Sequence, residues 1–378
     1  MGAGGVAALR SPRVLPWWSD PVLTMNKGHC RRGRLVPAQG PRWVIQRVWA
    51  ESQISMKAEP TMIGWQERVG AQRDWRWRGW PVRYTYVQGG GAQEAKPLLL
   101  LHGFGASIGH WRHNLTALGQ QHPVYALDLL GFGASAKAIA PYGVEFWVEQ
   151  IYDFWRTFIG RPVVLVGNSI GSLVSLAVAA AHPEMVCGLV MLNLPDSSVL
   201  ENPLWVRSLG KLAQPVAKPF LLGLKWIFTS PLFVNNLFRI IRHPRVIRLW
   251  VRQAYANPAA ITDELVEILS QPAYERGAAK TLRAMVNGKS QGRANYSAKA
   301  VLPTLQMPML LFWGLQDVMV PPKLARLFLA YNPNLKLIEI ENAGHCPHDE
   351  CPEFVNGEIL AWVASWAAEA QAGQPLRA

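Results

Sequence analysis

Residues 163–171 read Val-Val-Leu-Val-Gly-Asn-Ser-Ile-Gly, an apolar run that ends in the pattern Gly-x-Ser-x-Gly. The run predicts a strand buried on both faces, and the residues that follow, 169–181, predict a helix. A serine between such a strand and helix occupies a sharp, strained turn that lifts its hydroxyl clear of the sheet. Glycines suit positions 167 and 171 because larger side chains would collide with the neighbouring strand and helix. We therefore predict that Ser169 is a nucleophile, the alternative being a purely structural turn.

The same alternation of apolar strand and helix extends on both sides of this segment. Between residues 194 and 304 it gives way to a helical sequence in which aromatic residues are interleaved with arginine and lysine. The pattern predicts an α/β protein with a doubly wound, mostly parallel sheet that is interrupted by one helical insertion. Strands are expected at 75–78, 82–88, 97–101, 124–127, 163–166, 186–192, 309–313 and 335–340, and helices at 108–119, 145–159, 169–181, 322–330 and 352–368.

The chain is expected to divide into five parts. Residues 1–70 are rich in arginine, proline, glycine and tryptophan without a sustained period, which indicates a disordered basic extension. The core then follows in two parts, with the helical insertion between them and a short tail at the end. The expected bounds of these parts are 71–194, 195–304, 305–370 and 371–378.

The 378-residue chain has a net charge of +13, and half of its residues are hydrophobic. The charge favours anionic partners, but no nucleic-acid-binding signature is visible, so we expect no nucleic-acid partner. No transmembrane stretch or signal peptide is indicated, and four cysteines suggest reduced thiols in the cytoplasm rather than a disulfide framework. Cys346, His348 and Cys351 match no common zinc spacing, so we expect neither a metal nor a cofactor.

A serine hydroxyl needs an adjacent base, and a histidine is the usual one. His345 follows the strand expected at 335–340, and Asp317 follows the strand expected at 309–313. An acid in this place would hold the imidazole in one tautomer and stabilise the imidazolium. Asp196, which follows the strand expected at 186–192, is the competing acid. We predict Ser169 as nucleophile, His345 as general base and Asp317 as the acid.

Backbone N–H groups should stabilise the oxyanion that forms when a serine attacks a carbonyl. The amide of Ile170, next to the nucleophile, is one expected donor, and the amide of Phe104 in the loop Leu-His-Gly-Phe-Gly at 101–105 is the other. His102 is expected to order this loop rather than to act as a second base. In the glycine-rich segment 128–135, Asp128 is expected to bond loop amides. The residues expected to line the substrate site are Asn168, His102, Gly103 and Trp205.

These motifs, together with Gly-Leu-Gln-Asp at 314–317 and Gly-His-Cys-Pro-His at 344–348, resemble the α/β-hydrolase superfamily over about residues 75–368. The resemblance implies an eight-stranded, mostly parallel sheet flanked by helices, with a helical lid inserted after strand six. The segments 75–79, 110–114 and 344–350, with Asn168, are similar to a cyanobacterial and plastid branch that contains enzymes resembling pheophytinase and chlorophyll dephytylase. That branch implies a lipophilic carboxylic ester as substrate, for instance a phytyl ester of a tetrapyrrole.

Most of the net charge lies in the expected lid, where residues 201–300 contain 15 Lys and Arg and 5 Asp and Glu. This charge fits a solvated helical face or a cap that touches an anionic thylakoid or plasma membrane at its periphery. The favoured function is an ester hydrolase. The alternatives are a C–C bond hydrolase or acyltransferase with the same triad, since Asn168 also resembles the meta-cleavage C–C hydrolases, and a non-catalytic ligand-binding member of the fold.

Overall fold

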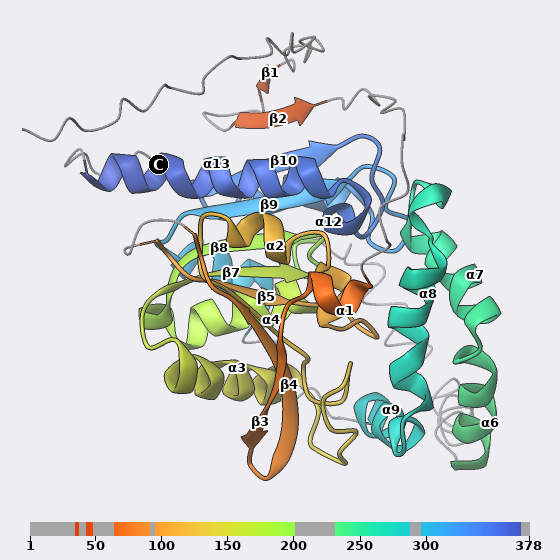
Figure 1. Ribbon diagram of the computed structural model, residues 1–378. Coiled ribbons are helices and arrows are strands. Elements are labelled where there is room, and N and C mark those ends of the chain that lie inside the picture. The colour runs from red at the N-terminus through yellow and green to blue at the C-terminus, as the bar shows by residue number, and fades with distance from the viewer. Residues whose placement is uncertain are drawn as a thin grey trace, which may run out of the picture.

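The structure, a computed structural model, describes residues 35–37, 43–47, 64–90, 95–200, 231–287 and 296–371. Within them, ten strands form one sheet in the order β1-β2-β10-β9-β8-β7-β5-β6-β4-β3, with helices packed on both faces (Figure 1). The pairings β1–β2, β3–β4 and β4–β6 are antiparallel and the others are parallel. The strands are β1 (Leu35–Pro37), β2 (Trp43–Arg47), β3 (Gln72–Trp77), β4 (Trp80–Val87), β5 (Leu98–Leu101), β6 (Val124–Leu127), β7 (Val163–Asn168), β8 (Val186–Leu192), β9 (Met309–Gly314) and β10 (Leu335–Ile340).

The eight strands expected from the sequence are β3 to β10, and the predicted mostly parallel α/β sheet is confirmed. Two further strands, β1 and β2, come from a segment for which the sequence indicated no regular structure. β2 pairs in parallel with β10, whose outer edge would otherwise leave its backbone groups unpaired. The division of the chain into extension, core, lid and tail stays a prediction.

Helices cover both faces of the sheet because its central strands are apolar on both sides. In β5, Leu99 and Leu101 pack into the hydrophobic cluster that contains α3 and α4. Leu98 and Leu100 face the opposite cluster, which contains α2 and α13. The alternation follows the two-residue period of a strand, and burying each leucine contributes about 1.5–3 kcal/mol. The core helices are α1 (Trp65–Arg68), α2 (Leu115–Gly119), α3 (Val144–Phe158), α4 (Ile170–Ala181), α10 (Ala298–Val301), α11 (Lys323–Phe328), α12 (Pro347–Glu350) and α13 (Pro352–Gln371).

The helix expected at 108–119 is divided in two. A short 3₁₀-helix, η1 (Ile108–Trp111), precedes α2. Between them, the Asn114 side chain donates to His348 O at 3.1 Å and to Asn356 Oδ1 at 2.8 Å. These contacts with α12 and α13 accompany the break in the helix, and they fix the position of η1 beside the loop that carries His345.

Among the described residues, five α-helices lie between β8 and β9 in the chain, and four of them stand to one side of the sheet (Figure 1). They are α6 (Pro231–Ile241), α7 (Pro244–Ala254), α8 (Asp263–Ser270) and α9 (Ala278–Asn287), and we refer to them as the cap helices. Thr262 caps α8 by accepting from the Leu265 N–H at 3.1 Å. Short 3₁₀-helices follow α4 in the core, as η2 (Pro183–Met185), and join or follow the cap helices and α10, as η3 (Pro258–Ala260), η4 (Gln271–Tyr274) and η5 (Leu302–Thr304). In the described part of the chain, no helix has the length and apolar character needed to cross a membrane.

Candidate active site

The turn between β7 and α4 holds Ser169 at φ 54° and ψ −119°, a region that few non-glycine residues adopt. Its N–H donates to Leu192 O on β8 at 2.9 Å. A Cβ at Gly167 would lie 2.4 Å from the Gly171 carbonyl, and one at Gly171 would lie 2.1 Å from Leu101 O. Both positions therefore require glycine, because a larger side chain at either would collide with neighbouring backbone, as the sequence predicted.

His345 lies in the loop between β10 and α12, and Asp317 follows β9. Their atoms His345 Nδ1 and Asp317 Oδ2 are 2.7 Å apart, and both residues are buried. Ser169 and His345 line the same cavity. The three residues thus come from the carboxyl ends of β7, β9 and β10, which share one edge of the parallel sheet.

The Asp317 carboxylate accepts hydrogen bonds on both oxygens. Oδ1 accepts from the N–H groups of Met319 at 2.8 Å and Val320 at 3.0 Å, and Oδ2 accepts from Asn193 Nδ2 at 2.7 Å. Burial alone would raise the pKa of Asp317, but the hydrogen bond and charge of His345 and the other donors outweigh it and lower this pKa. Asp317 is therefore ionised at neutral pH, and His345 Nδ1–H donates to it.

Asn193 is a site residue that the sequence reasoning missed. It directly follows β8 and has φ 50°, a left-handed backbone that asparagine tolerates better than most residues. Its side chain also donates to Gly344 O at 3.2 Å, so it joins the acid to the histidine loop. A polar residue at the end of a fully apolar strand was the available signal.

The competing acid, Asp196, is bonded elsewhere. Its Oδ1 accepts from the Ser198 N–H at 2.6 Å, and its Oδ2 accepts from the Ala298 N–H at 2.8 Å, at the start of α10. These bonds give Asp196 a structural partner at each oxygen. The acid that contacts the His345 ring is Asp317.

The loop after β5 packs against the serine turn. A Cβ at Gly103 would lie 3.0 Å from Asn168 Oδ1 and 3.5 Å from Ser169 Cβ. The Ala106 N–H donates to Gly103 O at 3.2 Å across the turn that contains Phe104. The Ile170 N–H, at the first position of α4, has no partner within the helix. Both amides expected to bind an oxyanion thus adjoin Ser169 or its packed loop, and their role stays a prediction.

The residues expected to bind substrate fall in three places. Asn168 and Gly103 line the cavity, and Asn168 Nδ2 donates to His345 O at 3.0 Å. His102 is fully buried and is not among the cavity-lining residues. Its ring contacts Gly103 O at 2.7 Å and accepts from the Leu129 N–H at 3.0 Å, while burial lowers its pKa to about 4. The structure therefore places neutral His102 beneath the site as a loop-ordering residue. Trp205 lies outside the described residues.

The cavity has a volume of about 400 Å³ and lies between the sheet edge and the cap helices. The core contributes Gly103, Phe104, Asn168, Ser169 and His345 to its wall. The cap side is mainly apolar, with an arginine at its edge; its lining includes Phe238, Ile241, Arg242, Ile247, Trp250, Val251, Leu269, Leu282 and Met285. An apolar cavity with a few polar groups at one end is typical of a site for a small lipophilic molecule.

The glycine-rich loop 128–135 is ordered by hydrogen bonds to the Asp128 side chain. Asp128 is buried, its Oδ1 accepts from the Ile108 N–H at 2.6 Å and its Oδ2 accepts from the Ala134 N–H at 2.7 Å. A Cβ at Gly133, which has φ 48°, would lie 2.1 Å from this carboxylate. The predicted role of Asp128 in bonding loop amides is confirmed.

The cysteine and histidine residues that suggested zinc have other surroundings. Cys346 is buried in a hydrophobic cluster with cap residues, and the His348 ring packs on Trp111 with ring centroids 4.3 Å apart. Within the described ranges, no group of three or more His, Cys, Asp and Glu side chains is arranged to hold a metal ion.

A family model described as "Alpha/beta hydrolase family" matches residues 98–358. Chloroplastic pheophytinase from Arabidopsis thaliana is 28% identical over 312 residues, which cover 71% of this chain and 61% of that protein. Epoxide hydrolase 4 from Mus musculus is 26% identical over 382 residues, which cover 95% of this chain and 98% of that protein. The chain therefore spans less than two thirds of the length of pheophytinase but nearly all of epoxide hydrolase 4.

Solved structures show the same fold at low sequence identity. A bacterial membrane phospholipase A aligns with a TM-score of 0.61 at 23% identity, covering 80% of this chain and 88% of that one. CarC, a serine hydrolase involved in carbazole degradation, aligns with a TM-score of 0.60 at 22% identity, covering 78% of this chain and 98% of that one. Because the family model covers more than half of the sequence, the chain belongs to the alpha/beta hydrolase family.

Proposed function

We propose that this member of the family is a serine hydrolase that cleaves a lipophilic carboxylic ester through an acyl-enzyme. The observation that carries the proposal is the 2.7 Å contact between His345 Nδ1 and Asp317 Oδ2 beside a cavity that Ser169 also lines. With Nδ1–H bound to the carboxylate, Nε2 of His345 is left with a lone pair and can accept a proton.

In the proposed reaction, the Ser169 oxygen attacks the ester carbonyl carbon while its proton passes to His345 Nε2. The oxyanion that forms is stabilised by the amides of Phe104 and Ile170. When the carbonyl re-forms, the bond to the alcohol oxygen breaks and the alcohol leaves with the proton from His345. Water, activated by the same histidine, then attacks the acyl carbon and releases the acid and free Ser169.

The apolar wall of the cap supports a lipophilic substrate. Burial of each CH₂ group contributes about 0.8 kcal/mol, so a long hydrocarbon chain would bind mainly by contact with this wall. The 28% identity with pheophytinase supports a phytyl ester of a tetrapyrrole as one such substrate. The nucleophile is a serine rather than an aspartate, which argues against epoxide hydrolysis despite the similarity to epoxide hydrolase 4.

A fluorophosphonate probe and an ester panel test the proposal. We expect an adduct on Ser169 that is lost in Ser169→Ala, and release of p-nitrophenol that rises with acyl length; pheophytin and chlorophyll serve as tetrapyrrole esters. A folded protein that neither reacts with the probe nor cleaves any ester would contradict the enzyme interpretation and favour a ligand-binding protein. Labelling without ester cleavage would favour an acyltransferase or a C–C hydrolase; Asn168 before the nucleophile supports the C–C hydrolase.

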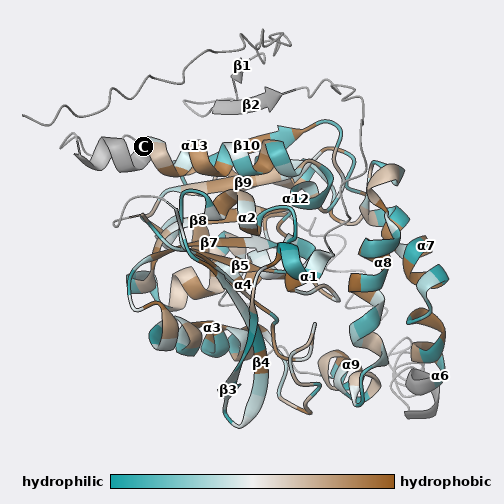
Figure 2. Cartoon of the chain, viewed as in Figure 1, coloured by the Kyte–Doolittle hydropathy of each residue, from teal (hydrophilic) through white to brown (hydrophobic). Residues whose placement is uncertain are grey.

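A peripheral contact with an anionic membrane would give such an enzyme access to its substrate, and we include it in the proposal. On α6 and α7, Ile240, Leu249 and Trp250 are 61%, 58% and 67% exposed, and Arg245 and Arg252 are exposed beside them. Figure 2 shows hydrophilic and hydrophobic residues along α7. Trp250 also lines the cavity, so this face adjoins the substrate site. Exposed apolar groups with flanking cations suit an anionic bilayer surface.

Vesicle co-sedimentation tests this contact. We expect binding to vesicles that contain phosphatidylglycerol, weaker binding to pure phosphatidylcholine, and weaker binding still for the double variant Leu249→Ser, Trp250→Ser. Equal partition of the wild type and this variant would contradict the contact.

A further inference from the structure

The loop that carries His345 lies directly against the end of cap helix α7. The backbone N–H of His345 donates to Ala254 O, at the last residue of α7, over 2.6 Å. A Cβ at Gly344 would lie 2.4 Å from the same Ala254 oxygen and 2.9 Å from Ala256 N. The backbone of the proposed general base is therefore bonded to the cap as well as to the core.

One carboxylate bonds both of these chain segments. Glu350, at the end of α12, accepts from the Gly344 N–H on Oε1 at 2.7 Å. Its Oε2 accepts from the N–H groups of Ala256 at 2.6 Å and Asn257 at 3.1 Å. Because a carboxylate accepts more strongly than a neutral group, Glu350 holds the histidine loop and the cap segment 254–257 in one arrangement.

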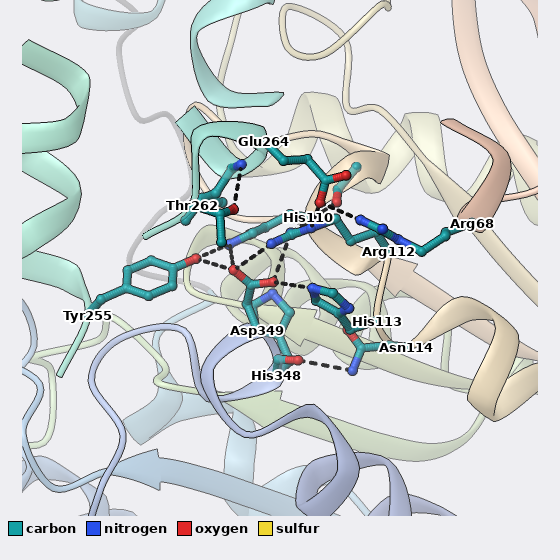
Figure 3. Close-up of polar contacts among 12 residues, drawn as sticks. Arg68, His110, Arg112, His113, Asn114, Tyr255, Thr262, Glu264, His348 and Asp349 are labelled. Carbon is teal, nitrogen blue, oxygen red and sulfur yellow. Dashed lines mark hydrogen bonds and ion pairs between the residues drawn. The ribbon is translucent and has the colours of Figure 1, made fainter. Parts of the chain in front are cut away.

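A buried polar network makes a second attachment between cap and core (Figure 3). The Tyr255 hydroxyl donates to Asp349 Oδ2 at 2.6 Å, and the same hydroxyl lies 2.8 Å from His110 Nε2. Arg112 forms an ion pair with Asp349 at 2.8 Å and bonds cap residue Glu264 at 3.0 Å. Asp349 precedes Glu350 in the chain, so both attachments converge on α12, directly after the histidine loop.

We propose that Glu350 is a positioning residue that couples docking of the cap to the geometry of His345. With the segment 254–257 docked, the loop 344–346 is bonded on both sides and the imidazole is held toward Ser169 and Asp317. With the cap displaced, the His345 N–H loses its acceptor on Ala254, Glu350 loses the N–H donors of Ala256 and Asn257, and the base loses its alignment. A ligand that holds the cap down would thereby complete the catalytic site. This inference rests on the proposed function.

The variant Glu350→Gln tests the coupling. Glutamine has nearly the same size, but its NH₂ group cannot accept, so the three N–H groups can no longer all be satisfied. The matched control is Glu353→Gln, which changes an exposed glutamate three positions further along the chain. The substrates are p-nitrophenyl acetate, whose acyl group is too short to contact the apolar cap residues of the cavity, and p-nitrophenyl decanoate, whose acyl chain is long enough to contact them.

We expect Glu350→Gln to lower kcat by about 10- to 100-fold for both esters, since a small misplacement of a catalytic group costs up to about 10²-fold. The KM for the acetate ester should change by less than about threefold, because ground-state binding of that ester is not altered. The rate of fluorophosphonate labelling of Ser169 should fall by the same factor as kcat, and Glu353→Gln should match the wild type.

A loss confined to the KM of the decanoate ester would show that Glu350 only shapes the binding wall, and would overturn the proposal. Wild-type kcat in Glu350→Gln would overturn it as well. If Glu350→Gln does not fold by circular dichroism, Tyr255→Phe takes its place, since it keeps the ring and removes the hydroxyl that bonds Asp349 and His110. It should lower kcat for both esters, and wild-type kcat there would also contradict the coupling.

The proposed function and the proposed coupling fail in different ways. If the wild type shows neither labelling nor hydrolysis, the proposed function is wrong. If the wild type is active and Glu350→Gln equals Glu353→Gln, only the coupling is wrong.

Discussion

Ser169 and His345 line one cavity but are held by different kinds of structure. The backbone of Ser169 is bonded to β8 and to the first turn of α4, both parts of the core. His345 is held by the Asp317 carboxylate, by Asn168 Nδ2 and by the Ala254 carbonyl of the cap. The serine geometry thus comes from one continuous strand, turn and helix with a bond to the neighbouring strand β8, whereas the histidine geometry comes from segments of both core and cap that are far apart in the chain. Changes remote in sequence should therefore disturb the base more than the nucleophile.

Removing the proposed nucleophile should have the largest effect. Ser169→Ala deletes the attacking oxygen, and we expect kcat to fall by about 10⁵- to 10⁶-fold, since loss of a triad serine has an effect of this order. The measurement is steady-state hydrolysis of p-nitrophenyl decanoate, with thermal denaturation to verify folding.

The matched control for this change is Ser175→Ala on the same helix. Ser175 is buried, and its hydroxyl has no hydrogen-bond partner among the residues that the structure describes, so its removal should leave kcat near the wild-type value. A Ser169→Ala protein with substantial remaining activity would mean that the core does not supply the nucleophile.

Changing the acid that contacts His345 should have the next largest effect. Asp317→Asn should lower kcat by about 10⁴-fold, because an amide permits the wrong imidazole tautomer. Asp196→Asn is the control, since it alters the competing acid in the same way. It should change stability more than kcat, because the Asp196 carboxylate bonds the backbone N–H groups of Ser198 and Ala298. The reverse order of effects on kcat would assign the acid role to Asp196.

The cap side of the cavity can be altered without changing Ser169 or His345. Met285→Trp adds bulk to a lining position, and we expect kcat/KM for the decanoate ester to fall about tenfold, which corresponds to about 1.4 kcal/mol, with little change for the acetate ester. Val286→Trp places the same bulk at an adjacent, 62% exposed position and should have no such selectivity. Equal losses for both esters would mean that the wall does not discriminate chain length.

The smallest effect concerns stability in acid. The pKa of Asp317 is lowered in the folded protein, mainly by the bond and charge of His345 acting against burial. Such a group stabilises the fold above its unfolded pKa and ceases to do so as the pH falls through the lower, folded value. Urea denaturation from about pH 6 to about pH 3 should show a steeper loss of unfolding free energy for the wild type than for Asp317→Asn. Parallel curves would contradict the ionised pair.

The sequence predicts the turn at Ser169 much more completely than it predicts the surroundings of His345. The apolar run, the two glycines and Ser169 are consecutive, so their conformation follows from local sterics. Asp317 and His345 could be found because each follows a predicted strand whose end lies at the same sheet edge. Asn193 was signalled only by its place at the end of an apolar strand and Glu350 by nothing in the sequence, because their partners are fixed only when distant segments pack. For the same reason, the sequence could not show that the His102 ring is buried beneath the cavity.

The backbone of Ser169 also sets a limit on how stable this protein can be. A side chain held at φ 54° costs the folded state on the order of 1–3 kcal/mol. Glycine would adopt that conformation freely, so Ser169→Gly would relax the turn but remove the hydroxyl on which the proposed chemistry depends. Selection for thermal tolerance and selection for turnover would thus favour opposite residues at this one position.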